Sequence, residues 1–102
     1  MNTRKKYNIQ DLERRYGRLT FSKFLISWRK SENLSQVEFS EKLGISKANL
    51  CDLEKGRKGV SPERAAEIAR KLGLPPAGLI QLALQDMLDD LGLDYEVEVE
   101  AA

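Results

Sequence analysis

Apolar residues along the middle of the chain recur with the period of an α-helix. After Thr20, a suitable N-cap, four of them fall at i, i+3, i+4 and i+7 and share one face: Phe21, Phe24, Leu25 and Trp28. This stripe predicts a helix that begins at residue 21 and ends near Asn33. Similar patterns predict a short helix over 8–16 and further helices over 36–43, 47–54, 62–72 and 76–91.

Two of these helices are joined by a very short connection. Ser35 and Glu38 have the spacing of a capping box at the start of the first helix, and Gly44 can end it in the left-handed conformation. Only Ile45 separates Gly44 from Ser46, which is an N-cap for the second helix. The pattern therefore predicts a helix-turn-helix, with an ordinary helical hairpin in a small bundle as the alternative.

The last part of the chain follows a different pattern. Residues 93–100 alternate between apolar and acidic side chains, which predicts a β-strand. No other segment of the chain reads as a strand, so we expect its main chain to pair with a second molecule. The helix over 76–91 is apolar on more than one face and would contribute to the same contact. The residues expected to form this dimer or partner surface are Leu84, Met87, Leu88, Leu91, Leu93, Tyr95, Val97 and Val99.

Charge is distributed unevenly along the 102 residues, although the net charge is only +1. Residues 1–74 hold all 17 basic side chains and nine of the 16 acidic ones, whereas residues 75–102 hold seven acidic side chains and no basic one. Such an asymmetry indicates two surfaces with different partners. The basic part suits a nucleic acid, and the acidic part suits a protein.

Composition excludes several function classes. The chain has no histidine and a single cysteine, Cys51, so we expect no metal site, no cofactor and no enzymatic activity. No apolar run approaches the roughly 20 residues that span a bilayer, and the first ten residues do not form a secretory signal. An unpaired thiol suits a reducing compartment, so we expect a cytoplasmic protein, bacterial or phage-encoded, with no membrane partner.

Residues 24–73 resemble the phage repressor and Cro family of DNA-binding proteins, often called the Xre family. The resemblance rests on Leu34-Ser35-Gln36, Leu43-Gly44-Ile45-Ser46, Leu50, Leu53-Glu54 and Gly56-Arg57. Ser40 departs from the family pattern, which usually has alanine there, but serine is small enough to fit. Together with the tail pattern, the resemblance implies an all-α, five- to six-helix repressor-like domain with a short C-terminal β-strand. Its expected parts are a basic extension with a short helix (1–19), the DNA-binding domain (20–91) and the acidic strand (92–102).

The resemblance also implies which residues contact DNA. Gln36 would touch a phosphate and brace the recognition helix. The positions over the major groove would be Lys47, Ala48, Asn49 and Asp52, where Asp52 would either read cytosine or pair internally. The phosphate contacts would come from Ser46, Lys55, Arg57 and Lys58, unless the loop residues are simply solvated. Arg29 and Glu54 would form a structural pair.

One helix-turn-helix unit buries too little surface for high specificity, so we expect a homodimer on a double-stranded operator. Small Xre proteins with flanking extensions look like HigA-type antitoxins, which repress their own operon and bind a basic RelE-type toxin. The acidic tail has the charge to engage such a partner. A stand-alone prophage or restriction–modification regulator and a protein-interaction module that no longer binds DNA are the alternatives.

Overall fold

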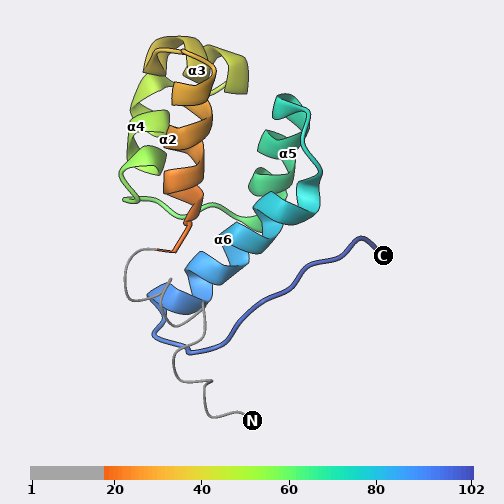
Figure 1. Ribbon diagram of the computed structural model, residues 1–102. Helices are drawn as coiled ribbons and strands as arrows, with labels where there is room; N and C mark the ends of the chain where they lie inside the picture. Colours follow the sequence, from red (N-terminus) through yellow and green to blue (C-terminus); the bar gives the residue numbers. More distant parts are fainter. Residues whose placement is uncertain (1–17) are drawn as a thin grey trace.

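The computed structural model describes residues 18–102, and over that range it contains five helices and no β-strand (Figure 1). The helices are α2 (Phe21–Ser31), α3 (Gln36–Leu43), α4 (Lys47–Glu54), α5 (Pro62–Leu72) and α6 (Pro76–Asp90). All five lie where the hydrophobic pattern predicts them, within two residues at each end. The helix predicted over 8–16 lies outside the described residues.

The predicted capping residues set the ends of α3 and α4. Ser35 Oγ accepts from the N–H of Glu38 at 3.0 Å, and Glu38 Oε1 accepts from the N–H of Ser35 at 2.8 Å. Gly44 follows α3 with φ 71°, a conformation that costs a residue with a Cβ atom. Ser46 then caps α4 by accepting from the N–H of Asn49 at 3.0 Å. These short-range bonds fix the turn between the two helices.

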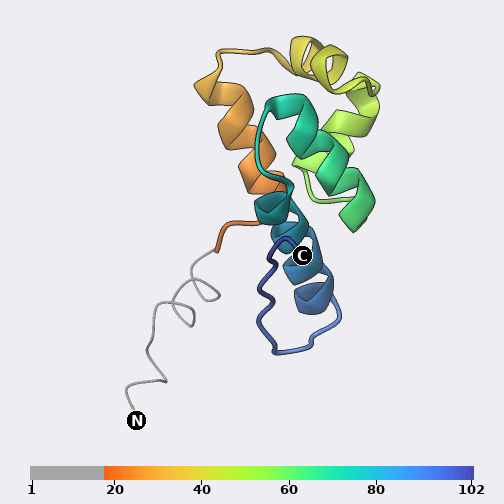
Figure 2. The same cartoon turned by 90° about the vertical axis from the view of Figure 1, so that its right-hand side faces the viewer.

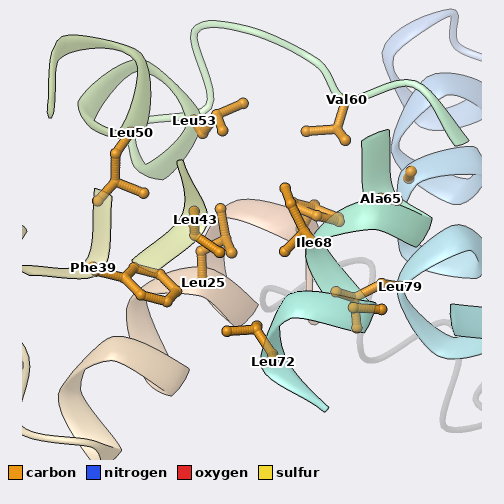
Figure 3. Close-up of a cluster of buried hydrophobic side chains, with 13 residues drawn as sticks. Leu25, Phe39, Leu43, Leu50, Leu53, Val60, Ala65, Ile68, Leu72 and Leu79 are labelled. Carbon is orange, nitrogen blue, oxygen red and sulfur yellow. The ribbon is translucent and has the colours of Figure 1, made fainter. Parts of the chain in front are cut away.

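The apolar stripes meet in one core. Helix α4 packs against α2 and α3, while α6 packs against α5 and α2. Figure 3 shows side chains from all these helices converging on Leu25 and Ile68. Trp28 packs against this core together with Phe24, with 6.2 Å between their ring centroids. The core members with buried side chains are Phe21, Leu25, Phe39, Leu43, Leu50, Leu53, Val60, Ala65, Ile68, Ala69, Leu72, Leu79 and Ala83.

Helix α6 buries only part of its apolar surface. Leu79 and Ala83 are its buried residues, whereas Met87 is 45% exposed and Leu91, the residue that follows the helix, is 72% exposed. Burial of these side chains within the described chain is therefore incomplete. The exposed apolar surface continues past α6 through Leu93, which is 43% exposed.

The predicted C-terminal β-strand is wrong. Residues 93–102 form an extended segment, the tail, which turns back and runs beside α6 (Figures 1 and 2). Gln85 Nε2 donates to the carbonyl of Tyr95 at 2.8 Å, and the N–H of Val97 donates to Gln85 Oε1 at 2.9 Å. The N–H of Val99 donates to Gln81 Oε1 at 3.0 Å. Because the described chain offers no second strand, two glutamine side chains take the place of a strand partner.

The start of the described chain is also attached to α6. Arg18 Nε donates to Asp89 Oδ2 at 2.6 Å, and its Nη2 donates to Asp86 Oδ1 at 2.7 Å. Burial lowers the pKa of Arg18, but the hydrogen bonds that it donates to both aspartates outweigh this effect, so the pKa lies above its ordinary value. Asp86 Oδ2 also accepts from the N–H of Phe21 at 3.0 Å. Arg18 thereby ties the beginning of α2 to α6.

Candidate nucleic-acid interface

Helix α4 presents a short polar face at the surface. Leu50 and Leu53 point into the core and Glu54 is also buried, so the surface of the helix is formed mainly by its first turn. Lys47 and Ala48 are exposed, and Asn49 is half-buried. The three side chains lie in the first turn of α4, next to the turn from α3. This is the part of a recognition helix whose residues reach base edges in the major groove.

A buried polar network holds α4 against α2 and α3. Glu54 is 7% exposed, and its carboxylate accepts from Arg29 Nε at 2.8 Å and Arg29 Nη2 at 3.1 Å. Gln36 Nε2 donates to Glu54 Oε1 at 2.9 Å, and Cys51 Sγ donates to Gln36 Oε1 at 3.3 Å. The hydrogen bond that Arg29 donates to Glu54 is the main cause of the raised pKa of Arg29. The network joins the N-terminal turn of α3 to the last turn of α4 and fixes their relative angle.

This network leaves Gln36 with an unused donor. An amide Nε2 carries two hydrogens, and Glu54 accepts only one. Gln36 is also the first residue of α3, where main-chain N–H groups have no partner within the helix. The helix dipole adds partial positive charge at the same place. Gln36 can therefore brace α4 and still donate to an anion.

The loop after α4 carries the densest group of basic side chains near this face. Lys55 is exposed, and the side chains of Arg57 and Lys58 are 62% and 61% exposed. Asp52 Oδ1 lies 3.4 Å from Arg57 Nη1, and Asp52 Oδ2 lies 3.6 Å from Lys58 Nζ. Of the two roles expected for Asp52, the described structure has the internal pairing. Asp52 thus lies within ion-pair distance of both cations beside α4.

The structure gathers the residues expected to contact DNA around one end of the molecule. Ser46, Lys47, Ala48 and Asn49 begin α4, and Asp52 lies one turn later with the basic loop directly after it. In Figures 1 and 2, α3 and α4 lie at the opposite end of the molecule from the tail. The tail nonetheless begins beside the basic loop, because Gly56 and Lys58 line the same surface pocket as Leu93 and Asp94.

Several contributing residues escape sequence reasoning. Lys71 of α5 donates from Nζ to the carbonyl of Leu43 at 2.6 Å and so caps α3 from another helix. Gln81 and Gln85 hold the tail. Their i, i+4 spacing on an otherwise apolar helix is the only local signal, and it does not reveal what they bind. The sequence around Arg18 does not indicate its role, since its partners Asp86 and Asp89 lie about 70 residues away along the chain.

Two negative findings apply to residues 18–102. No group of three or more cysteine, aspartate or glutamate side chains there is arranged to hold a metal ion. None of the helices in this range has the length and apolar character needed to cross a bilayer.

Comparison with known proteins agrees with this geometry. The family model described as Helix-turn-helix matches residues 25–79, which is just over half of the chain. The match covers α3, α4 and α5 with the turns between them, together with most of α2 and the start of α6. Neither the curated proteins nor the solved structures gave a match. The chain therefore belongs to the helix-turn-helix family of DNA-binding regulators.

Proposed function

We propose that this protein is a transcriptional repressor that binds a specific DNA operator as a homodimer. The observation that carries the proposal is the exposed first turn of α4 beside a basic loop, both fixed by the network around Glu54. Lys47 has the chemistry to donate to guanine O6 and N7, and Asn49 to pair with adenine. Ala48 can lie against a thymine methyl group. Together these three residues would read base edges.

Phosphate contacts would come from the two sides of this reading helix. Ser46 Oγ uses only its acceptor to cap α4, so its hydroxyl hydrogen is available to a phosphate. Gln36 has its second amide hydrogen, and Lys55, Arg57 and Lys58 supply positive charge. A phosphate would replace Asp52 as the partner of Arg57 and Lys58. Contacts of this kind position a protein on DNA without selecting sequence.

The proposed dimer follows from the surface that α6 leaves open. Leu84 and Leu88 are half-buried, and Met87 and Leu91 are 45% and 72% exposed. Their i, i+3, i+4 and i+7 spacing places them on one stripe of the helix. The stripe lies at the end of the molecule away from α4, so two copies joined there could both present a recognition helix to one duplex.

A salt titration of DNA binding tests the role of the loop. The double variant Arg57→Gln/Lys58→Gln should bind every DNA sequence more weakly and lower the slope of log K against log salt by about 2. Asp52→Asn should do the opposite and raise affinity several-fold, on the order of 0.5–1 kcal/mol for exposed pairs. Unchanged affinity and slope in both proteins would refute the loop as a phosphate-binding element.

A second candidate function is that of an autoregulating antitoxin that also binds a basic RelE-like toxin. The acidic tail favours it, because Glu96, Glu98 and Glu100 are all exposed on a segment with no basic residue. This candidate predicts a gene for a small, very basic ribonuclease beside the gene for this chain. Adding the purified chain should abolish cleavage of RNA by that protein. An undiminished cleavage rate would leave the repressor function alone.

A further inference from the structure

The tail has one occupied edge and one open edge. Its hydrogen bonds to α6 come from the carbonyl of Tyr95 and from the N–H groups of Val97 and Val99, which are every second residue. In an extended chain, the main-chain groups of successive residues point to opposite sides. Those of Glu96 and Glu98 therefore point away from α6, and within residues 18–102 they make no hydrogen bond.

The edge of the tail that faces α6 is held by the side chains of Gln81 and Gln85 and not by a second strand. The tail is therefore extended but has no strand beside it within the described residues. Val97 and Val99 are half-buried, whereas Glu96 and Glu98 are exposed, so the alternation of the sequence is preserved in space over residues 96–99, although Tyr95 is exposed. No basic residue occurs anywhere in residues 75–102. Every side chain of α6 and of the tail is therefore neutral or negatively charged. Arg18 pairs with Asp86 and Asp89 of α6, so the negative charge at the open edge comes from the exposed Glu96 and Glu98.

We propose that the open edge of the tail binds an exposed edge strand of another protein that carries lysine or arginine at alternate positions. The main-chain groups of Glu96 and Glu98 would pair with that strand, and their carboxylates would lie opposite its cations. The proposal rests on the antitoxin candidate above and deepens it, because it names the edge that is used and the kind of strand that fits.

A second copy of the tail fits this edge poorly. Residues that exchange both main-chain hydrogen bonds lie directly opposite each other in an antiparallel pair. If two tails paired through their open edges, the even-numbered residues would have to face one another, for example Glu98 against Glu98 and Glu96 against Glu100. Like charges directly opposite each other destabilise a strand pair. The same geometry, with the glutamates directly opposite the residues of the partner strand, disfavours a second tail and favours a strand with basic side chains.

Amide hydrogen exchange of the full chain, followed by NMR, tests the proposal. The probe is a synthetic β-hairpin, closed by a disulfide, with lysine at alternate positions of one open edge. At saturation, it should slow exchange at Glu96 and Glu98 roughly tenfold or more, with a smaller effect at Val97 and Val99, which already donate to glutamine. A matched hairpin with glutamate at those positions should have no effect.

A charge-neutralising variant distinguishes the contribution of the carboxylates to hairpin binding from that of the main-chain hydrogen bonds. Glu96→Gln/Glu98→Gln keeps the open edge and should bind the lysine hairpin several-fold more weakly, whereas Glu67→Gln on the exposed face of α5 should not change binding. Unslowed exchange with the lysine hairpin, or equal slowing by both hairpins, would overturn the proposal. Slow exchange that increases with the concentration of the protein alone would assign the edge to a second copy. A failed hairpin experiment would leave the ribonuclease assay of the antitoxin candidate unaffected.

Discussion

At the scale of single residues, the buried carboxylate of Glu54 connects α4 to α2 and α3. It accepts three hydrogen bonds from two other elements, two from Arg29 and one from Gln36. The side chain of Arg29 is 17% exposed and that of Glu54 is 4% exposed, so water cannot readily replace either partner. The family resemblance pointed to the Arg29–Glu54 pair and to Gln36 as a brace of the recognition helix, but nothing in the sequence linked Cys51 to them.

Removal of this carboxylate should therefore be costly. Glu54→Ala leaves the guanidinium of Arg29 and the amide of Gln36 without their acceptor in a largely buried place, and should lower the free energy of unfolding by about 3 kcal/mol. Urea denaturation followed by circular dichroism measures this change. Glu67→Ala on the exposed face of α5 is the control, with an expected change within about 0.5 kcal/mol. Equal stability of the two variants would contradict a structural role for the network.

At the scale of elements, the sequence predicts the helices and the turn well because their signals are local. Capping serines, a glycine in the left-handed conformation and apolar periodicity each act within a few residues. The tail was predicted wrongly for the opposite reason. Its alternation correctly indicates an extended segment, but Gln81 and Gln85, which hold it, lie 10 to 18 residues away and could not be matched to it.

Two glycines allow the turn between α3 and α4 to be tested. Gly44 and Gly73 both have positive φ, 71° and 74°, so alanine at either position costs about 1–2 kcal/mol. A Cβ atom at Gly44 would also lie 3.2 Å from Lys71 Nζ, whereas one at Gly73 would meet nothing within 4 Å. Gly44→Ala should therefore destabilise the protein more than Gly73→Ala in urea denaturation. Equal losses in the free energy of unfolding would show that the Cβ atom at position 44 does not disturb the hydrogen bond from Lys71 Nζ to the carbonyl of Leu43.

At the scale of the whole molecule, the small net charge hides a basic surface and an acidic surface. The basic loop follows α4, and the acidic tail runs beside α6 (Figure 1), beginning next to that loop, where Lys58 and Asp94 line one surface pocket. The sequence shows this division through the position of its charges alone. It could not show that Asp52 offsets part of the basic surface, because an aspartate on an exposed helix face can pair with a base or with a neighbouring cation.

The proposed dimer also concerns the whole molecule, because it depends on the apolar stripe that α6 leaves exposed. Met87→Glu/Leu91→Glu would place two charges in the apolar stripe of α6 and should convert the dimer to a monomer in sedimentation velocity, because a buried charge needs a partner. Val37→Glu is the matched control, since Val37 is 48% exposed, close to the 45% of Met87, and belongs to α3, which lies away from the C-terminal end of α6 (Figure 1). An unchanged mass of the α6 variant would mean that this stripe is not the dimer interface.

The central claim, that the first turn of α4 reads DNA sequence, is tested most directly by selecting binding sites from random duplexes with the full chain. The wild-type protein should enrich a defined motif. Lys47→Ala and Asn49→Ala should each relax the preference at one position, at a cost of about 1–3 kcal/mol for the preferred base, while keeping the salt dependence. Failure of the wild-type protein to enrich any motif, or an identical motif from both variants, would contradict the claim.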